Sequence, residues 1–360
     1  MSDKARLIDE LLKAMVERQA SDLHLAVGSP PTYRIHGALV PIEDAPLTPE
    51  SLQEMVYAVL TPDAQKKFET QKELDFSYSL PGVSRYRGNA LLQRGTMGAV
   101  FRAIPSRPPT LEEMGFPPIL KEFCKKPRGL VLVTGPTGSG KSTTLAAMIG
   151  HINANEKVHI VTIEDPIEFL YKNNKAIIRQ RELGADTHSF AEALKHVLRQ
   201  DPDVILVGEM RDLETIALAI TAAETGHLVF GTLHTTGAAA TVDRIVDVFP
   251  PYQQQQVRIQ FASTLEGVIS QTLVPTSDGK GRVCAMEIMV GSPAVRNLVR
   301  EGKSHQIMSV IQSGGALGMI SLDGALKNLV TAGKVSFEEA MLKSSNSEDF
   351  KRLCDKDGRP

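Results

Sequence analysis

The chain has 360 residues and a formal net charge of −2. This length is sufficient for two domains, and the balanced charge gives no support for a nucleic-acid partner or a membrane surface. Cys124, Cys284 and Cys354 are far apart in the sequence, which argues against a structural zinc site and a disulfide framework. No apolar run approaches the ~20 residues of a membrane span, so we expect a cytoplasmic protein without direct membrane insertion.

Residues 1–104 have the pattern of a small α+β domain. Apolar residues recur at helical spacing over 3–19, and Thr48 followed by Pro49 marks the start of a second helix that ends near residue 60. Alternating apolar and polar residues predict the strands of this domain, over 21–25, 32–37, 74–80 and 84–104.

Arginines are frequent on the late strands of this domain, at Arg85, Arg87, Arg94 and Arg102. Residues at spacing two, such as Arg85 and Arg87, share one face of a strand. A solvated edge that discourages strand pairing explains these arginines, and so does a basic face that binds phosphate groups. The residues alone leave both interpretations open.

A proline-rich segment, 105–118, separates this domain from the next, and we expect it to be a semi-rigid hinge. From 119 to 290 apolar strands alternate with helical segments, which predicts an α/β fold with a mainly parallel sheet and helices on both faces. Residues 291–354 predict a helical C-terminal region, and we expect 355–360 to be a disordered tail.

The elements of the α/β domain are predicted from hydrophobic periodicity. We expect strands over 129–134, 158–163, 204–208, 227–233 and 282–288. We expect helices over 141–153, 189–200, 212–224, 238–247 and 252–272.

A glycine-rich segment lies between the strand over 129–134 and the helix that follows it. It reads Gly135-Pro136-Thr137-Gly138-Ser139-Gly140-Lys141-Ser142-Thr143 and fits the phosphate-binding loop G-x-x-x-x-G-K-[ST]. Backbone N–H groups of such a loop turn toward a polyphosphate, and the helix N-terminus adds partial positive charge. Lys141 can reach the β- and γ-phosphates and Ser142 can bind Mg²⁺, so the segment predicts a nucleotide site with Mg²⁺.

Acidic residues follow two of the predicted strands, where ligands bind in open α/β sheets. Glu164 follows the strand over 158–163, and Glu209 follows the apolar strand over 204–208 in a Walker B pattern. One carboxylate should hold Mg²⁺ and the other should orient or deprotonate the attacking water. We assign Glu164 to the water and Glu209 to the metal; the reverse assignment, or a helix-capping role, stays open.

Two histidines flank the strand over 227–233. His234 follows its far end, where it can donate a hydrogen bond to the γ-phosphate and so report whether ATP or ADP is bound. His227 begins the strand, and we include it among the candidate nucleotide-binding residues. A purely structural role explains either histidine as well.

These motifs together indicate a family. The phosphate loop and the segments 163–168, 208–212 and 225–235 resemble the Walker A, Asp, Walker B and His boxes of the type II/IV secretion ATPases. The segment 294–301, AVRNLVRE, is close to the AIRNLIRE helix of the pilus retraction ATPases among them. The resemblance covers nearly the whole chain, in order and at the family's spacing.

The resemblance implies a PAS-like N-terminal domain, a RecA-type P-loop ATPase domain and a homohexameric ring that uses ATP with Mg²⁺. It also implies that arginines of the N-terminal domain reach the phosphates, with Arg87 and Arg102 as leading candidates and Arg85 behind them. The implied activity is ATP hydrolysis coupled to type IV pilus retraction. The partner would be an inner-membrane pilus platform protein, at the cytoplasmic face of that membrane.

Three alternatives remain to be tested. The first is a related motor, either a secretion ATPase or an accessory paralogue of the retraction motor. The second is an ATP-binding switch that does no mechanical work, although both acidic residues of a hydrolysing site are present. The third is a nucleic-acid translocase, which the net charge of −2 and the absence of tryptophan disfavour.

Overall fold

The computed structural model describes residues 3–42, 45–105 and 107–355, which form two compact units. Unit 1 contains the described residues up to Arg107 together with Glu168–Leu170, and unit 2 contains the remainder. Within unit 1, the Leu170 N–H donates to the carbonyl of Pro105 at 3.2 Å. Ser106 of the predicted hinge and 356–360 of the predicted tail lie outside the described residues.

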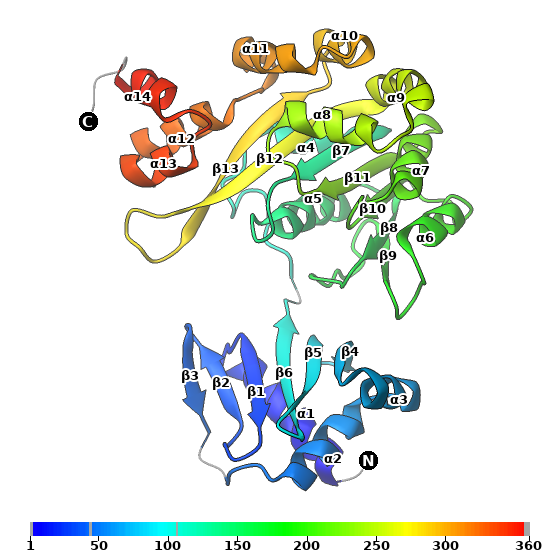
Figure 1. Ribbon diagram of the computed structural model, residues 1–360, viewed down its shortest axis with the longest axis vertical. Coiled ribbons are helices and arrows are strands. Elements are labelled where there is room, and N and C mark those ends of the chain that lie inside the picture. Colours follow the sequence, from blue (N-terminus) through cyan, green and yellow to red (C-terminus); the bar gives the residue numbers. More distant parts are fainter. Residues whose placement is uncertain (1–2, 43–44, 106, 356–360) are drawn as a thin grey trace. The chain divides into compact units, whose positions relative to one another are not determined.

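Unit 1 is built on a six-stranded antiparallel sheet in the order β3-β2-β1-β6-β5-β4 (Figure 1). Thr48 caps its second helix by accepting a hydrogen bond from the N–H of Ser51, as the sequence predicts. The strands are β1 (Asp22–Ala26), β2 (Thr32–Ile35), β3 (Ala38–Pro41), β4 (Glu73–Leu80), β5 (Ser84–Gln93) and β6 (Thr96–Ile104). The helices are α1 (Asp3–Glu17), α2 (Pro49–Val59) and α3 (Pro62–Gln71).

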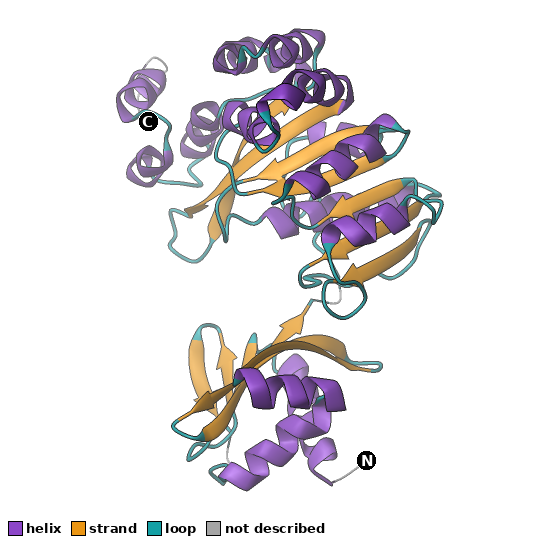
Figure 2. Ribbon diagram, turned by 45° about the vertical axis from the view of Figure 1, so that its right-hand side comes forward, coloured by secondary structure: helices purple, strands orange, loops and turns teal. Residues whose placement is uncertain are grey.

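The core of unit 1 lies between one face of this sheet and the helices (Figure 2). Tyr33, Tyr86 and Phe101 are buried there, and both tyrosine hydroxyls donate at 2.8 Å to backbone carbonyls in the middle of α1. Because side chains alternate along a strand, Arg87 and Arg102, next to Tyr86 and Phe101, belong to the opposite face. The buried tyrosines therefore fix which face of the sheet carries the arginines.

Unit 2 contains a seven-stranded sheet in the order β13-β12-β7-β11-β10-β8-β9. Only the β12–β13 pair is antiparallel, which confirms the mainly parallel α/β fold. The strands are β7 (Gly129–Thr134), β8 (His159–Glu164), β9 (Ile177–Glu182), β10 (Val204–Val207), β11 (Leu228–Leu233), β12 (Leu265–Pro275) and β13 (Arg282–Val290). The helices around it are α4 (Ile119–Cys124), α5 (Lys141–Asn155), α6 (Phe190–Val197), α7 (Leu213–Glu224), α8 (Ala238–Asp247) and α9 (Pro251–Thr264).

The C-terminal part of unit 2 is helical, as predicted. Its α-helices are α10 (Pro293–Glu301), α11 (Ile307–Ser313), α12 (Leu322–Thr331), α13 (Phe337–Lys343) and α14 (Ser347–Asp355). Two short 3₁₀ turns, Ser304–Gln306 and Gly315–Leu317, join them. In the described part of the chain, no helix has both the length and the hydropathy to span a bilayer.

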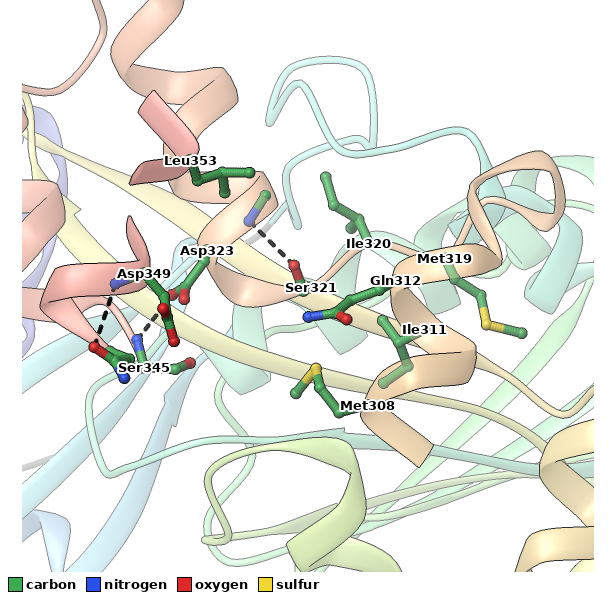
Figure 3. A pocket seen from close by; sticks show the side chains of 12 residues that line it. Met308, Ile311, Gln312, Met319, Ile320, Ser321, Asp323, Ser345, Asp349 and Leu353 are labelled. Carbon is green, nitrogen blue, oxygen red and sulfur yellow. Dashed lines mark hydrogen bonds between the residues drawn. The ribbon is translucent and has the colours of Figure 1, made fainter. Parts of the chain in front are cut away.

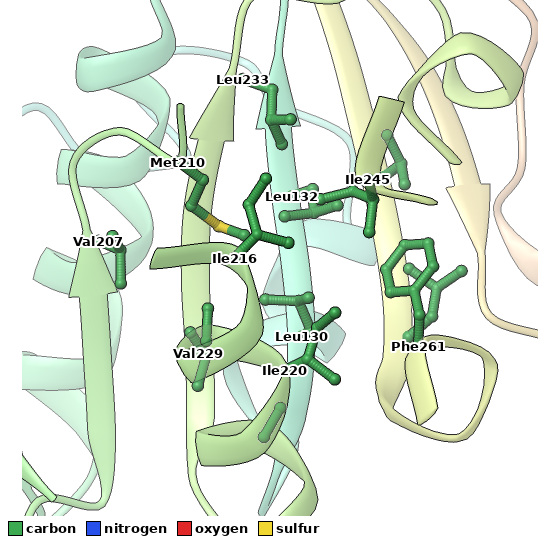
Figure 4. Packing of buried hydrophobic residues seen from close by; sticks show 14 of the residues in the cluster. Leu130, Leu132, Val207, Met210, Ile216, Ile220, Val229, Leu233, Ile245 and Phe261 are labelled. Carbon is green, nitrogen blue, oxygen red and sulfur yellow. The ribbon is translucent and has the colours of Figure 1, made fainter. Parts of the chain in front are cut away.

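Both faces of the sheet in unit 2 are covered, so its central strands are apolar throughout. Leu130 and Leu132 of β7 pack with α7, α8 and α9 (Figure 4). Val131 and Val133 of the same strand pack with α4 and α5 on the other face. This two-sided burial holds the carboxyl ends of the strands, and the loops that leave them, in fixed positions.

The predicted helix over 252–272 is wrong in its second half. Helix α9 ends at Thr264, and β12 begins at Leu265 and inserts between β7 and β13. Buried strands such as this one lack polar–apolar alternation, so the apolar run around Val268 and Ile269 fits either type of element by periodicity alone. Strands β9 and β3 and helix α3 were also not predicted.

Candidate active site

The predicted phosphate loop connects β7 to α5, with the strand and helix on the two sides that the motif requires. Gly135 has φ +138°, and a Cβ at this position would lie 2.3 Å from the carbonyl oxygen of Gln271 on β12. Any larger residue would therefore push the loop away from that neighbouring strand. Gly140 has φ +88° at the start of α5 and turns the chain into the helix.

Polar atoms in this loop fit an anionic ligand. Lys141 folds back over the loop, where its Nζ donates to the carbonyls of Gly135 at 2.8 Å and Pro136 at 3.1 Å. The hydroxyls of Ser139 and Thr144 are buried without a hydrogen-bond partner among the described residues. Because a buried unpaired hydroxyl is costly, these groups favour a ligand that supplies acceptor oxygens.

Four candidate groups lie at the same edge of the sheet. The phosphate loop follows β7, His234 follows β11, Glu209 follows β10 and Glu164 comes at the end of β8. These four strands are neighbours in the sheet and run parallel. The sheet therefore gathers, along one edge, groups that are separated by up to about a hundred residues in the chain.

Glu164 is half-buried and held by its neighbours. It accepts hydrogen bonds from the hydroxyl of Thr162 at 2.6 Å and from the side-chain amide of Gln180 on β9 at 3.2 Å. Burial, followed by the Glu164 charge, raises the pKa of the nearby Tyr171 hydroxyl well above the ordinary value. The fixed carboxylate of Glu164 is suited to orient a water molecule.

Glu209 and His234 form a pair across β10 and β11. His234 Nε2 lies 2.8 Å from Glu209 Oε1, and Arg211 Nε contacts the same oxygen. The following residue, Met210, donates its N–H to the carbonyl of Thr232 at 3.0 Å and so joins the two strand ends. His234 thus contacts the Walker B carboxylate directly, and its contact with a γ-phosphate stays a prediction.

His227 lies at the other edge of the sheet. It precedes β11, its carbonyl accepts from Gly129 at the start of β7, and its Nδ1 lies 2.8 Å from the carbonyl of Ala222. The six residues of β11 span about 20 Å. Within this chain the structure does not bring His227 together with the phosphate loop, because the two histidines flank opposite ends of one strand, and a nucleotide-binding role of His227 stays a prediction.

The candidate arginines belong to unit 1. Arg87 on β5 and Arg102 on β6 are directly opposite each other in the antiparallel ladder, and their side chains are 46% and 69% exposed. Arg102 is also opposite Asp22 of β1, and Arg102 Nε donates to its carboxylate at 2.8 Å. Arg85 lies two residues before Arg87 on the same strand face and is less exposed.

Two side chains, one on β12 and one on the predicted strand β13, hold the loops of the site, and this supporting role was not predicted from the sequence. The Gln271 side chain on β12 donates to the carbonyl of Ser139 in the phosphate loop at 2.7 Å. Glu287 on β13 accepts from the first N–H of α8, at Ala238, at 2.8 Å. Burial raises the pKa of Glu287, against the opposing effect of the N–H groups of Ala238 and Leu322. Gln271 lay in a predicted helix, so no sequence signal marked its role.

A cavity of about 580 Å³ lies in the C-terminal region (Figure 3). Its walls come mainly from α11, α12, α14 and the segment before α12, and include Met308, Ile311, Met319, Asp323, Asp349 and Leu353. Among the described residues that line it, none is Lys, Arg or His. Two carboxylates without a cation do not suit nucleotide phosphates, so this cavity is not the candidate site.

Comparison with known proteins agrees with this geometry. The family model for type II/IV secretion system proteins matches residues 2–342. The chain belongs to that family. This type II/IV secretion system protein has an intact phosphate loop and two carboxylates at strand ends, and it is an ATP hydrolase. The family predicted from the four sequence boxes is therefore confirmed.

Individual members of the family are also similar to this chain. The chain is 53% identical over 343 residues to a protein named type IV pilus retraction ATPase PilT of Pseudomonas aeruginosa, and the match covers 95% of this chain and 99% of that one. It is 54% identical over 320 residues to a twitching motility protein of Neisseria gonorrhoeae, covering 89% and 86%. A crystal structure of the pilus retraction motor PilT with bound ADP has 47% identity and a TM-score of 0.89, covering 96% and 99%.

Proposed function

We propose that this chain is an ATPase motor that couples ATP hydrolysis to type IV pilus retraction. The observation that carries the proposal is the gathering of the phosphate loop, His234, Glu209 and Glu164 at one edge of the parallel sheet. The similarity to a pilus retraction ATPase over nearly the whole chain gives this site its biological context.

In the proposed site, ATP binds with its phosphates in the loop over 135–143. Lys141 neutralises charge on the β- and γ-phosphates, and Ser142 with Glu209 would hold Mg²⁺, which supplies charge neutralisation at the transferred phosphoryl group. The unpaired hydroxyl of Ser139 and the partial charge at the N-terminus of α5 add to this anion-binding loop.

Glu164 is assigned to the attacking water. Its contacts with Thr162 and Gln180 fix the carboxylate, as in-line attack requires. Oε1 of Glu209 already contacts both His234 and Arg211, so the capacity of this carboxylate to accept a proton is partly used. His234 is positioned to transmit a change at Glu209 to the end of β11.

Arg87 and Arg102 of unit 1 are proposed to contact the phosphates during turnover, where guanidinium groups stabilise developing charge. The working assembly is proposed to be a homohexamer that acts on an inner-membrane pilus platform protein from the cytoplasmic face. Nucleic acid is not expected to take part. The related motor, the non-motor switch and the translocase remain as outcomes of the tests below.

The proposal is tested by measuring ATP turnover, ATP binding and oligomer mass for the wild type, Glu164→Gln and Glu209→Gln. A hydrolysing hexamer whose variants bind ATP but turn over at least about tenfold more slowly supports the site. Tight ATP binding by a monomer without hydrolysis in the presence of Mg²⁺ supports a switch instead, and turnover stimulated by duplex DNA supports a translocase. Restoration of pilus retraction in a retraction-deficient strain separates this motor from a related secretion ATPase or an accessory paralogue.

A further inference from the structure

A row of charged residues crosses the sheet of unit 1, on the face away from its helices. Asp22 on β1 is directly opposite Arg34 on β2 and also opposite Arg102 on β6, and Arg102 is in turn opposite Arg87 on β5. Residues directly opposite in an antiparallel ladder point to the same face. Three guanidinium groups and one carboxylate therefore line up across four adjacent strands.

The carboxylate is the buried member of this row. The Asp22 side chain is 6% exposed, whereas Arg87 and Arg102 are substantially exposed. Its Oδ1 accepts from Arg102 Nε at 2.8 Å, and its Oδ2 accepts from the Ser21 hydroxyl at 2.8 Å. Burial acts to raise the pKa of Asp22, but the bonds from Ser21 and Arg102 and the charge of Arg102 outweigh it and keep the pKa low. Asp22 is therefore a fixed anion at neutral pH.

The contact between Asp22 and Arg102 is made through Nε. In the described parts of the chain, the structure records no hydrogen bond from the two terminal Nη nitrogens of Arg102. A guanidinium held at Nε keeps both Nη groups for a bidentate contact with a phosphate. The buried carboxylate thus fixes the side chain without occupying the end that binds an anion.

The same carboxylate offsets a repulsion. Arg87 and Arg102 are like charges directly opposite each other, an arrangement that is unfavourable on a sheet. The other carboxylate near them, Asp75, is 66% exposed and 4.0 Å from Arg87, where solvent screens its charge. Asp22 is therefore the carboxylate that offsets the repulsion between the two arginines when no anion is bound.

We propose that Asp22 is a positioning residue for the binding of the polyphosphate of ATP. It holds Arg102 through Nε, which leaves the terminal nitrogens of Arg102 available to the phosphates, and it offsets the repulsion between Arg102 and Arg87. This inference rests on the proposed function, because it assumes that these arginines meet the phosphates. It adds a residue on β1 that acts only through Arg102.

The test measures steady-state turnover of Mg²⁺–ATP by the full-length oligomer, together with its thermal unfolding midpoint. We expect Arg102→Ala to lower kcat at least about tenfold. Asp22→Asn should lower kcat about three- to tenfold with KM changed less than about twofold, since it misplaces Arg102 without removing it. In the Arg102→Ala background the Asp22→Asn change should alter kcat less than about twofold, because its target is gone. The matched control Asp75→Asn should stay within about twofold of wild type.

The outcomes distinguish failure of the positioning role of Asp22 from failure of the proposed phosphate contact of Arg102. Full activity of Arg102→Ala contradicts the role of the arginine itself, and the proposal for Asp22 fails with it. Loss of activity in Arg102→Ala but not in a folded Asp22→Asn overturns only the positioning role, and so does an equal loss in both backgrounds.

If Asp22→Asn lowers the unfolding midpoint too far to assay, Arg102→Lys takes its place, because it keeps the charge but has no Nε donor. We expect its kcat to stay below about one third of wild type. Wild-type turnover by Arg102→Lys would overturn the proposal.

Discussion

The two units of this protein place their candidate functional residues in different ways. In unit 2 the residues follow the ends of parallel strands, as His234 follows β11 and Glu209 follows β10. In unit 1 they lie within strands of an antiparallel sheet, as Asp22, Arg102 and Arg87 do, and meet through the register of the ladder. A parallel sheet gathers loops at an edge, whereas an antiparallel sheet gathers side chains across a face.

This difference determines what a substitution is expected to do. A strand-end residue in unit 2 is proposed to act on the ligand directly, so its loss should reduce turnover with little effect on stability. A residue within a strand is packed and paired, so its loss should affect both stability and activity. The following predictions test that contrast, starting with the largest expected effect.

Lys141→Ala should produce the largest loss of activity. The side chain donates to two carbonyls of its own loop, and its charge is proposed to act on the phosphates. We expect kcat/KM for ATP to fall about 10²- to 10³-fold. The thermal unfolding midpoint should change little. Lys175→Ala, at an exposed lysine in the same unit, is the control and should keep wild-type turnover. A similar loss in both variants would contradict the role of the loop.

Gln271→Ala tests the exception in unit 2, a residue within a strand that supports the phosphate loop. The substitution removes a buried 2.7 Å hydrogen bond to the carbonyl of Ser139. We expect kcat/KM to fall about tenfold because the loop loses its fixed position. The free energy of unfolding should fall by about 1–2 kcal/mol. The matched change Gln260→Ala, at a half-buried glutamine whose side-chain amide donates to Glu224 in an exposed contact, should do neither.

Glu287→Ala is expected to act mainly on stability. The carboxylate is 2% exposed and accepts from the N–H of Ala238 at the start of α8. Its loss leaves that N–H buried without a partner, so denaturant unfolding should show about 2–3 kcal/mol of destabilisation in unit 2. Turnover per folded molecule should change less than in Gln271→Ala. Unchanged stability would show that water replaces the carboxylate.

Asp22 should give unit 1 a measurable dependence of stability on pH. Its pKa is lower in the folded chain than in the unfolded chain, so its contribution is complete above the unfolded pKa of about 3.8. That contribution is lost as the pH falls through the folded pKa. Unfolding of the full chain, followed by the fluorescence of buried tyrosines such as Tyr86, should show a steeper acid loss in wild type than in Asp22→Asn. Parallel curves for the two proteins would contradict the pairing of Asp22 with Arg102.

The candidate site in unit 2 was largely accessible from the sequence. The phosphate loop, Glu164 and Glu209 each follow an apolar run, and a residue that follows a buried parallel strand lies at a known edge of the sheet. The sequence also included His227 among the candidate nucleotide-binding residues, although it precedes β11 whereas His234 follows that strand. The length of β11 separates the two histidines, at opposite edges.

The supporting residues were not accessible in the same way. Gln271 was placed in a helix, because a strand that is buried on both faces has no alternation to mark it. Asp22 was unremarkable in the sequence, since eighty residues separate it from Arg102. Only the pairing of β1 with β6 brings the two together.

The sequence by itself determined the family, the two kinds of domain, the phosphate loop and the acidic residues at strand ends. These features are local, because each depends on a short run of residues and on the element that the run begins or ends. The tertiary structure decided the order of the strands, the insertion of β12 beside β7 and the row of charges across unit 1. Those features depend on pairing between distant segments, where a register shift of one residue between β1 and β6 would place Asp22 and Arg102 on opposite faces.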